Sequence, residues 1–529
     1  MSKKSLAAAG ARLSLLTLGS RVLGLVREMT KASLLGTTGL ADAFGIAFMI
    51  PNLFRRLFAE NSISVAFIPT FKAYLEDSNT VQGRTEAQAF LSATCTVVSF
   101  CTVLVTVIGI VCAPFIVPVF TGSHPRGIVD ETVLLTRLMF PYLAIISFAA
   151  FLQGILNAVK IFSPSGFTPI LFNLIIIVCS YTLGNVLGNP ARAMAAGVIL
   201  GGLVQAFFQL PFVLKTGWRV AWMPVRKAFA NRGTRRVFAL IGPTIIGMAA
   251  YQLNDVVSTA LAGRAGSGIV SSLQYSLRLQ ELILGIFAVS IGTVILPDLS
   301  GLAKRRQWNE FSDMLLTAAK IIALITIPIT FFAFCAGEHI IILVYKNNRF
   351  TDESVRLTLE AFRFHIAGLF FIALNRIMAP AFYAQGNTKQ PTLAGIWGFA
   401  VNILLALCLS GSMGGGGIAL ALSAASAVNT VVLFIYLSKS RTVRSVQIVS
   451  ELLRYAVKLA VFSAAALVPT LFAARRLYQA FSGYGRIIGQ GVPLVLSALL
   501  FACCGLALLV LTKDSLLAGV IAKCRRRQS

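Results

Sequence analysis

Charged side chains are scarce in this sequence. They make up 12% of its 529 residues, against about 25% in an average soluble domain, whereas hydrophobic residues make up 57%. The mean hydropathy of +0.81 excludes an ordinary water-soluble globular protein, because this many apolar side chains need a solvent other than water. A bilayer-spanning helix takes about 20 apolar residues, so the chain has room for many spans.

Acidic residues are scarcer still, since 19 Asp and Glu stand against 46 Lys and Arg and leave a net charge of +27. In a soluble protein this excess would indicate nucleic-acid binding, which needs a basic stripe with aromatic or groove-reading elements. Here the basic residues occupy short segments between apolar runs, as in the cytoplasmic loops of membrane proteins. We therefore predict contact with membrane lipids and no nucleic-acid partner.

The sequence also lacks the patterns of a metal or redox site. Its three histidines are far apart, and its nine cysteines form no C-x-x-C pair and no disulfide framework. We predict no metal site and no cofactor, and leave coupling to the membrane potential or to an ion open. No cleaved signal peptide is expected, because Arg12, Arg21 and Arg27 interrupt the first apolar run.

No loop between the apolar runs is long enough to form a soluble catalytic domain, which argues for a transporter and against an enzyme. The runs themselves predict an all-α integral membrane protein with about fourteen transmembrane helices. Their expected limits are 11–34, 39–73, 88–118, 133–157, 166–186, 193–214, 236–262, 268–299, 312–336, 357–384, 390–410, 415–437, 452–474 and 487–512.

The loops alternate in basic charge, and this alternation predicts the orientation. The richer set includes 215–235, 304–306, 439–444 and the C-terminal tail, whereas the opposite set holds isolated cations such as Arg126. Lys and Arg concentrate on the cytoplasmic side of the inner membrane. Both termini are therefore predicted to be cytoplasmic.

The basic stretch before the seventh span also predicts a division of the chain. We expect an N-terminal lobe at 1–215, a cytoplasmic linker at 216–235, a C-terminal lobe at 236–438, and two further helices with a basic tail at 439–529. A short internal match between 58–69 and 287–297 favours two six-helix lobes related by a pseudo-repeat. Such repeats are common in transporters.

Charged side chains inside apolar spans are costly and usually face a cavity or a partner. In the first span, polar residues recur in steps of three and four, which places them on one stripe of a helix. They are Ser14, Thr17, Ser20, Arg21, Gly24, Arg27, Glu28 and Lys31. A helix lying in the membrane interface would show the same stripe, but the short Gly-Thr-Thr-Gly turn and the long span after it favour a crossing helix.

The second span has its own set of polar residues, which are Asp42, Asn52, Arg55, Arg56, Glu60 and Asn61. Pro51 should kink this helix near its middle. On an ideal helical wheel Asp42, Arg56 and Glu60 share a face with Asn52, and Arg55 is offset from them by about 100°.

Cations outnumber acids in these two spans. The cations are Arg21, Arg27, Lys31, Arg55 and Arg56, and the acids are Glu28, Asp42 and Glu60. Such a surplus at membrane depth needs an anion from elsewhere, such as phosphate, whose oxygens match the guanidinium fork. In later spans, Arg278 stands near Glu281, and ion pairs between helices better explain Asp255, Arg363 and Arg376.

At these residues the chain resembles the MurJ (MviN) family of lipid II flippases, within a superfamily that also contains multidrug and oligosaccharide exporters. The motifs that carry the resemblance are Ser20-Arg21-Val22-Leu23-Gly24, Arg27-Glu28, Ala41-Asp42-Ala43-Phe44, Pro51-Asn52-Leu53-Phe54-Arg55-Arg56-Leu57-Phe58-Ala59-Glu60, Ala66-Phe67-Ile68-Pro69, Tyr275 with Arg278, and Gly292-Thr293-Val294-Ile295-Leu296-Pro297. They weaken after about residue 300.

The resemblance implies a set of substrate-binding residues in one central cavity. The required arginines would be Arg21, Arg27, Arg55 and Arg278, with Asp42 as a required acid, Glu60 near the cytoplasmic gate, and Glu28 where relatives often have Asp. The family pattern places Arg55 before Arg56, and we keep both. Some relatives bind sodium through an acid in the eleventh span, where this chain has Asn402 and Ala406; this argues against sodium coupling.

The resemblance also implies what such a protein does. It would flip lipid II, the lipid-linked peptidoglycan precursor, from the cytoplasmic to the outer face of the inner membrane by alternating access. The last two spans would form a groove for the lipid tail, and proteins of cell-wall synthesis and division would be its partners. The alternatives are a flippase for another polyprenyl-linked glycan, a drug or cation antiporter of the same superfamily, or a glycan polymerase.

Overall fold

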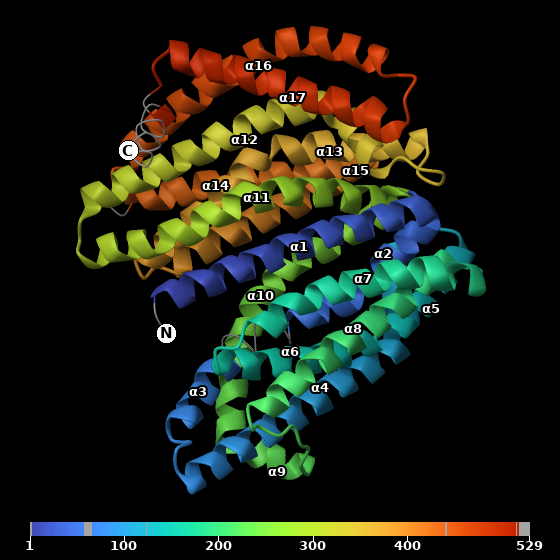
Figure 1. Cartoon of the computed structure of the whole chain (residues 1–529), viewed down its shortest axis with the longest axis vertical. Coiled ribbons are helices and arrows are strands. Elements are labelled where there is room, and N and C mark those ends of the chain that lie inside the picture. The colour runs from blue at the N-terminus through green and yellow to red at the C-terminus, as the bar shows by residue number, and fades with distance from the viewer. Residues whose placement is uncertain (1–2, 58–65, 123, 440–441, 515, 518–529) are drawn as a thin grey trace. The chain divides into compact units, whose positions relative to one another are not determined.

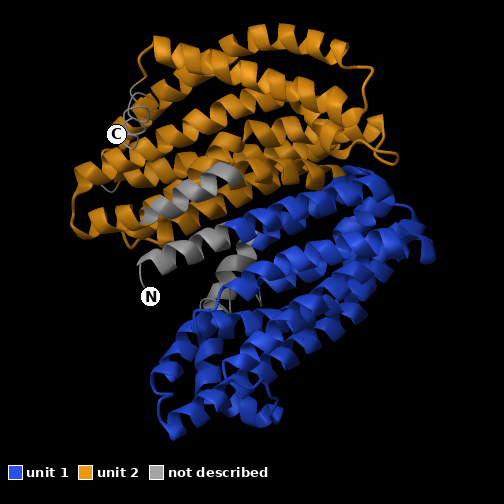
Figure 2. Cartoon of the chain, in the orientation of Figure 1, with its two compact units in different colours: residues 1–271 blue, residues 272–529 orange. Residues whose placement is uncertain are grey.

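The structure, a computed structural model, describes residues 3–57, 66–122, 124–439, 442–514 and 516–517, with side chains left out at 3–14, 242–251, 286–294 and 296. In these described segments the secondary structure is helical, and the ribbon in Figure 1 contains no strand. The chain divides into two compact units, residues 1–271 and 272–529 (Figure 2). Each unit is described separately below.

The first unit contains ten of the helices that the structure describes. They are α1 (Lys3–Leu35), α2 (Gly39–Arg55), α3 (Ile68–Glu76), α4 (Val81–Thr121), α5 (Arg126–Met139), α6 (Pro141–Ala158), α7 (Ser163–Val186), α8 (Pro190–Lys215), α9 (Val225–Ala230) and α10 (Arg232–Ala265).

The second unit contains the other seven described helices, of which α11 begins in the last residues of the first unit. They are α11 (Ile269–Lys304), α12 (Trp308–Tyr345), α13 (Asp352–Ala367), α14 (Leu369–Ala384), α15 (Lys389–Lys439), α16 (Ser445–Ala480) and α17 (Arg486–Leu511).

The predicted fold class is confirmed, since each of the fourteen expected spans coincides with a described helix or helix pair. Helices α5 and α6 together form the fourth span. Helices α13 and α14 form the tenth and meet at an angle of 44°. Helix α15 covers two spans, and its backbone breaks at Gly414, whose φ of 51° and ψ of −129° are not helical.

Nine of the described segments are long and apolar enough to cross a membrane when the bent α13–α14 pair is counted as one span. The charged residues Arg27, Asp42, Asp255 and Arg278 lie on α1, α2, α10 and α11, respectively.

Small residues hold the helices of the first unit close together. A Cβ at Gly197 on α8 would lie 2.9 Å from the Cα of Ile176 on α7, and one at Gly201 would lie 2.9 Å from the Phe172 ring. Close backbone approach through small residues is how helices associate where lipid offers no hydrophobic driving force. At the other end of the unit, Phe67, Phe90 and Phe151 form a buried aromatic cluster.

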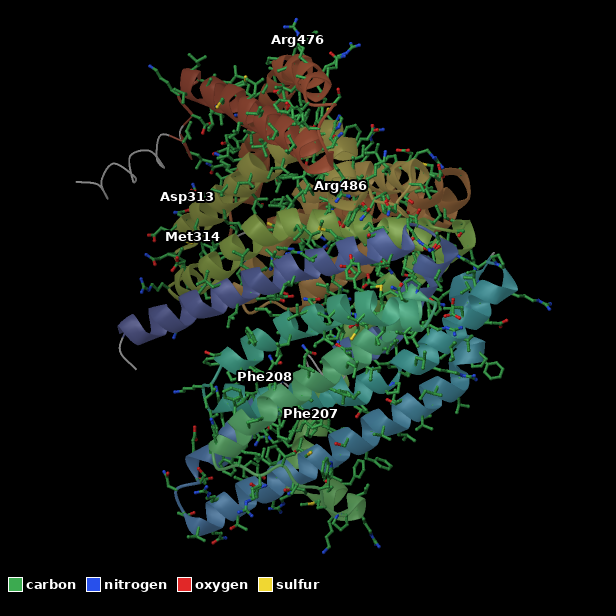
Figure 3. All side chains as sticks on the ribbon, turned by 45° about the vertical axis from the view of Figure 1, so that its right-hand side comes forward. Phe207, Phe208, Asp313, Met314, Arg476 and Arg486 are labelled. Carbon is green, nitrogen blue, oxygen red and sulfur yellow. The ribbon has the colours of Figure 1, made fainter. Side chains whose placement is uncertain are left out.

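The apolar surface of the first unit faces outward, as a membrane requires. On α1, Leu15, Leu18 and Val22 are 70%, 54% and 53% exposed and recur in steps of three and four, opposite the polar stripe. Figure 3 shows Phe207 of α8 at the surface, where it is 65% exposed.

In the second unit, α12 is the central support of the last two helices, because α16 and α17 pack against it and against each other. Lys320 Nζ lies 2.7 Å from Glu451 Oε2, which joins α12 to α16. The unit boundary after Ser271 falls inside the expected C-terminal lobe. The lobe limits of 1–215 and 236–438 stay a prediction.

Candidate functional site

The polar stripe of α1 contains a close ion pair. Arg27 Nη2 donates to Glu28 Oε1 at 2.7 Å, and the two side chains are 20% and 14% exposed. One turn further, Lys31 is 3% exposed, and its ammonium lies 5.9 Å from the centre of the Phe44 ring. Arg21 is partly buried on the same helix. Three cations thus stand against the single acid Glu28 on this stripe, which keeps a net positive charge.

Asp42, near the start of α2, is fully buried and bound from three sides. Its Oδ2 accepts from the backbone N–H of Gly268 at 2.6 Å, and its Oδ1 accepts from the backbone N–H of Ser271 at 2.7 Å. All of these residues belong to the first unit. Because α11 begins at Ile269, the carboxylate satisfies N–H groups at a helix N-terminus, where negative charge is favoured.

The third partner of Asp42 is His124, in the turn between α4 and α5. Its Nε2 lies 3.1 Å from Asp42 Oδ2, and its Nδ1 lies 2.7 Å from the carbonyl oxygen of Thr121. Both neighbours are acceptors, so a doubly protonated ring satisfies both bonds. The hydrogen bond to Asp42 accordingly raises the pKa of His124 above its ordinary value, against the opposing effect of burial.

These contacts give Asp42 a structural role that the sequence did not predict. Its oxygens bind a histidine and two backbone amides that lie 82, 226 and 229 residues away. Its role as a required acid of the cavity stays a prediction. Gly268 is required here for two reasons. Its φ is +83°, and a Cβ would lie 2.3 Å from the carbonyl oxygen of Thr37.

The two neighbouring arginines at the end of α2 have different partners. Arg55 Nε donates to Asn52 Oδ1 at 2.7 Å on its own helix. Arg56 Nη1 donates to Asp255 Oδ2 at 3.0 Å and to Gln252 Oε1 at 3.3 Å, which ties α2 to α10. The predicted ion pair at Asp255 is therefore confirmed. The choice between Arg55 and Arg56 as the ligand-binding arginine stays a prediction.

Arg55 lines a cavity of about 260 Å³ between α2, α3, α6, α7 and α8. The other polar side chains of its lining are all neutral. They are Gln153, Asn157, Ser165, Thr168, Gln205 and Gln209. The described lining residues include no carboxylate, and Arg55 is the one cation among them. A ligand that enters meets this positive charge among amides and hydroxyls.

The amides of this cavity are partly committed to the protein and partly free for a ligand. Gln209 is 1% exposed, and its Nε2 donates to the carbonyl oxygens of Ala149 and Gln205. The Oε1 of Gln205 is buried and has no hydrogen-bond partner among the described residues. Sequence analysis missed these residues, although two pairs at four-residue spacing, Gln153–Asn157 and Gln205–Gln209, were a readable signal of a polar helix face.

The predicted site residue of the second unit, Arg278, lies on α11. Its Nη1 donates to Glu281 Oε2 at 3.2 Å, and its side chain is 25% exposed. Its Nε is buried and has no hydrogen-bond partner among the described residues. Nearby, Gln280 donates to the carbonyl oxygen of His365. Gln280 and His365 thus join α11 to α13 as structural residues.

Three other expectations can be compared with the structure. Arg363 was expected in an ion pair, but its guanidinium lies 5.7 Å from the centre of the Phe334 ring, which is a cation–π contact. Arg376 is exposed. Glu60 lies outside the described residues. Asn402 and Ala406 are both buried on α15, so the position expected for a sodium-binding acid carries no carboxylate.

The structure thus places Arg21, Arg27 and Arg55 in the first unit and Arg278 in the second. Their convergence on one central cavity stays a prediction. Across the described residues, no group of three or more His, Cys, Asp or Glu side chains could hold a metal ion.

Sequence comparison connects this architecture to known proteins. The model of the family described as "Lipid II flippase MurJ" matches residues 31–484. A probable lipid II flippase MurJ of Treponema pallidum is 50% identical over 515 residues, which is 97% of each chain. The lipid II flippase MurJ of Burkholderia cenocepacia is 32% identical over 427 residues, which is 80% of this chain and 82% of the relative.

Solved structures show the same fold. A lipid II flippase MurJ in an inward closed conformation superimposes with a TM-score of 0.77 at 23% identity, over 95% of this chain and 99% of that one. An inward-facing multidrug resistance transporter of the MATE family has a TM-score of 0.67 at 14% identity, over 80% of this chain and 94% of that one. With its apolar helices and these relatives, the chain is a multi-pass inner-membrane protein, and it belongs to the lipid II flippase MurJ family.

Proposed function

We propose that this protein flips lipid II from the cytoplasmic to the outer face of the inner membrane. A relative that matches 97% of the chain is described as a probable lipid II flippase, and the proposal extends that activity to this chain. The observation that carries it is the cavity around Arg55, whose described lining has one cation among neutral amides and hydroxyls.

The chemistry of the substrate explains why such a cavity is useful. The diphosphate and the sugar–peptide head group of lipid II cannot cross hydrocarbon unaided, because they would lose their hydration. Guanidinium groups replace water at the phosphate oxygens through charge-assisted hydrogen bonds. Amide and hydroxyl side chains such as Gln205 and Thr168 offer both donors and acceptors to sugar hydroxyls and acetamido groups.

Three arginines of the predicted site, Arg27, Arg55 and Arg278, are each oriented by a different neighbouring side chain. Glu28 fixes one nitrogen of Arg27 and leaves its remaining donors available. Asn52 Oδ1 accepts from Arg55 Nε, and Arg55 lines the cavity. Arg278 is held at Nη1 by Glu281. Each arginine is thus oriented by a short contact and still carries donors for an anion.

Transport would proceed by alternating access, with the head group in a cationic cavity and the polyprenyl tail in lipid. No bond is made or broken, so the protein acts as a transporter and not as an enzyme. The membrane potential, negative inside, would return an empty cationic cavity toward the cytoplasm with about 2.3 kcal/mol per charge per 100 mV.

A drug or cation antiporter is the second candidate, because the MATE transporter shares the fold. A cation substrate would need carboxylates in the cavity. The described lining of the Arg55 cavity has none, and Asp42 is used by the helix terminus and His124. A flippase for another polyprenyl-linked glycan would use the same cavity, and only the substrate itself separates it from the first proposal.

The deciding experiment uses the purified full-length protein in vesicles that contain lipid II on one face, with a reagent that labels only the head groups exposed outside. The wild type should equilibrate lipid II, Arg55→Ala should fail, and Arg55→Lys should act partly, because a point charge lacks the fork. Arg137→Ala is the matched control, since Arg137 is exposed in the same unit and bonds only the carbonyl oxygen of Ile110 among its recorded partners.

A second substrate completes this test. A polyprenyl-linked sugar without the peptide should be moved more slowly than lipid II. Equal movement of both would favour the general glycan flippase, and movement of organic cations with no movement of lipid II would favour the antiporter.

A further inference from the structure

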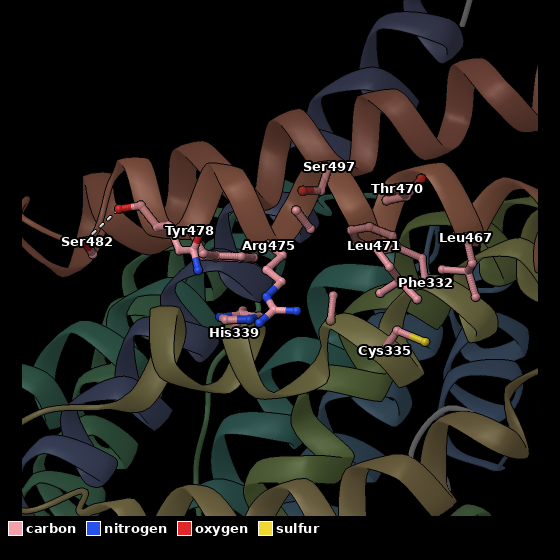
Figure 4. A pocket seen from close by; sticks show the side chains of 13 residues that line it. Phe332, Cys335, His339, Leu467, Thr470, Leu471, Arg475, Tyr478, Ser482 and Ser497 are labelled. Atoms are coloured by element: carbon pink, nitrogen blue, oxygen red, sulfur yellow. Dashed lines mark hydrogen bonds between the residues drawn. The ribbon is translucent and has the colours of Figure 1, made fainter.

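Three helices of the second unit, α12, α16 and α17, enclose a cavity of about 540 Å³ (Figure 4). Its volume lies within the range of small-molecule sites, about 300–1,000 Å³. The lining changes character along α16. Leu467 and Leu471 are apolar, whereas Arg475 and Tyr478 are polar, and the steps of three and four residues keep all of them on one face over about 15 Å.

The polar end of this cavity is built from two helices. The His339 ring of α12 stacks on the Tyr478 ring of α16 with centroids 3.5 Å apart and planes 11° apart. His339 Nδ1 lies 2.8 Å from Gln490 Oε1, which accepts, so Nδ1 carries a hydrogen. Figure 4 shows the Arg475 side chain reaching toward His339. The described lining contains no Asp or Glu, so the charge at this end is positive.

Two hydroxyl groups of the lining have no partner among the described residues. They are Tyr478 Oη and Ser497 Oγ, and both atoms are buried. Ser497, on α17, is 3% exposed. A buried hydroxyl without a hydrogen bond is unfavourable. An acceptor-rich ligand inside the cavity would satisfy both groups beside Arg475.

The apolar residues in and around the cavity favour an amphiphilic ligand over a small soluble ion. Its apolar end is lined by Phe332 and Leu467, and the neighbouring faces of α16 and α17 expose Phe472 at 74% and Leu499 at 56%. These side chains suit contact with acyl chains. A small soluble anion would use the polar end and leave the apolar part empty.

We propose that this cavity binds an anionic glycerophospholipid, with its phosphate at Arg475 and the Tyr478 hydroxyl and one acyl chain along Leu471, Leu467 and Phe332. The predicted topology places the polar end toward the outer leaflet. A groove for the uncharged polyprenyl tail alone, which the family resemblance implies for the last two spans, would need neither the arginine nor the free hydroxyls. The proposal stands apart from flipping, because it concerns binding alone.

The test measures lipid retention by native mass spectrometry on the purified full-length protein, in micelles doped with phosphatidylglycerol or phosphatidylcholine. The wild type should retain phosphatidylglycerol preferentially, and Arg475→Ala should lower that retention about tenfold, the range of one lost charged hydrogen bond. Arg476→Ala is the matched control, because the neighbouring Arg476 is exposed but does not line the cavity, and Figure 3 shows it pointing away from the helices.

Equal retention in the two alanine variants would overturn the proposal, as would equal retention of the two lipids by the wild type. Displacement of phosphatidylglycerol by inorganic phosphate alone would show a site for soluble anions instead. Displacement by a neutral polyprenol, to the same extent in the wild type and in Arg475→Ala, would show a tail groove.

A second measurement needs no substitution and therefore no assumption about folding. Cys335 lines the cavity and is exposed, so phosphatidylglycerol should slow its alkylation by a maleimide, read at that residue by peptide mass spectrometry. Cys408 is also exposed but does not line the cavity, and it should react at an unchanged rate. Equal protection of both cysteines, or of neither, would contradict the proposal.

Discussion

The cavities of the two units each contain one arginine, and they differ in what surrounds it. Around Arg55 the polar side chains of the described lining are amides and hydroxyls from three helices, whereas Arg475 stands at the end of a slot lined by Leu467, Leu471 and Phe332. A guanidinium among neutral polar groups suits a hydrated, sugar-rich anion, because every part of the ligand finds a hydrogen bond. The same group at the end of an apolar slot suits a phosphate that carries a hydrocarbon chain.

The two units also differ in how deeply their ion pairs are buried. In the first unit Asp42 and His124 form a pair whose side chains are fully buried, while the Arg56–Asp255 pair is 39% and 50% exposed. The second unit joins α12 and α16 through Lys320 and Glu451, which are also partly exposed. The Asp42–His124 pair is thus the most deeply buried of these three pairs, and the predictions below separate its structural role from the binding roles of the arginines.

The largest effect is expected from the arginines themselves. Alanine at Arg21, Arg27, Arg55 or Arg278 should lower flipping by about 10- to 100-fold, since each loses charge-assisted hydrogen bonds to the anion. The measurement is growth support after depletion of the native protein, with expression checked in isolated membranes. Arg363→Ala is the control, because that exposed guanidinium contacts the Phe334 ring. Normal growth with all four variants would contradict the cationic site.

Breaking the buried pair should be the next largest effect, and it should appear in stability. Asp42→Asn leaves His124 and two backbone amides without their carboxylate, which should lower the free energy of unfolding by about 3 kcal/mol. Asp255→Asn, at the exposed pair, should lower it by less than about 1 kcal/mol. Chemical unfolding in mixed micelles measures both. Similar losses in the two variants would show that burial is not what distinguishes them.

The sequence predicts a feature when its signal lies in one segment, and it does not identify contact partners that lie far apart along the chain. The fourteen spans were predictable because hydropathy reports contact with lipid, and the ion pair at Asp255 because an acid inside an apolar span needs a nearby cation. The partners of Asp42 were not, because His124 sits in a loop and the amides of Gly268 and Ser271 carry no side-chain signal at all.

The Arg55 cavity illustrates a different limit of the sequence. Its amides come from α6 and α8, and charge-based reasoning passed over them because a neutral amide in a span resembles an ordinary helix-packing residue. The prediction of an ion pair at Arg363 was wrong for a related reason. An aromatic ring can replace a carboxylate as the partner of a guanidinium, and the chain has 38 phenylalanines, so the sequence alone could not select Phe334.

The stability of the protein should depend on pH through the titration of His124, which is paired with Asp42. Its pKa is raised in the folded protein by Asp42, so its contribution is fully present below the unfolded value of about 6.5 and is lost as the pH rises through the raised value. The unfolding midpoint of the wild type should therefore fall over that interval, and His124→Asn should flatten this part of the profile. An unchanged profile in the variant would show that another group titrates.

The smallest effect concerns the neutral side of the Arg55 cavity. Gln205→Met keeps the length of the side chain and the backbone carbonyl that accepts from Gln209, and it removes an Oε1 that has no hydrogen-bond partner among the described residues. The fold should therefore be unharmed, and a buried unsatisfied acceptor is even relieved. Flipping of lipid II should fall about three- to tenfold, since one neutral hydrogen bond to the head group is lost. Ser497→Ala makes the parallel change in the second unit, where Ser497 Oγ is also buried without a described partner, and should leave flipping unchanged. If both variants reduced flipping equally, the two cavities would not differ in their ligands, and the contrast between an amide-lined and an apolar arginine site would carry no functional meaning.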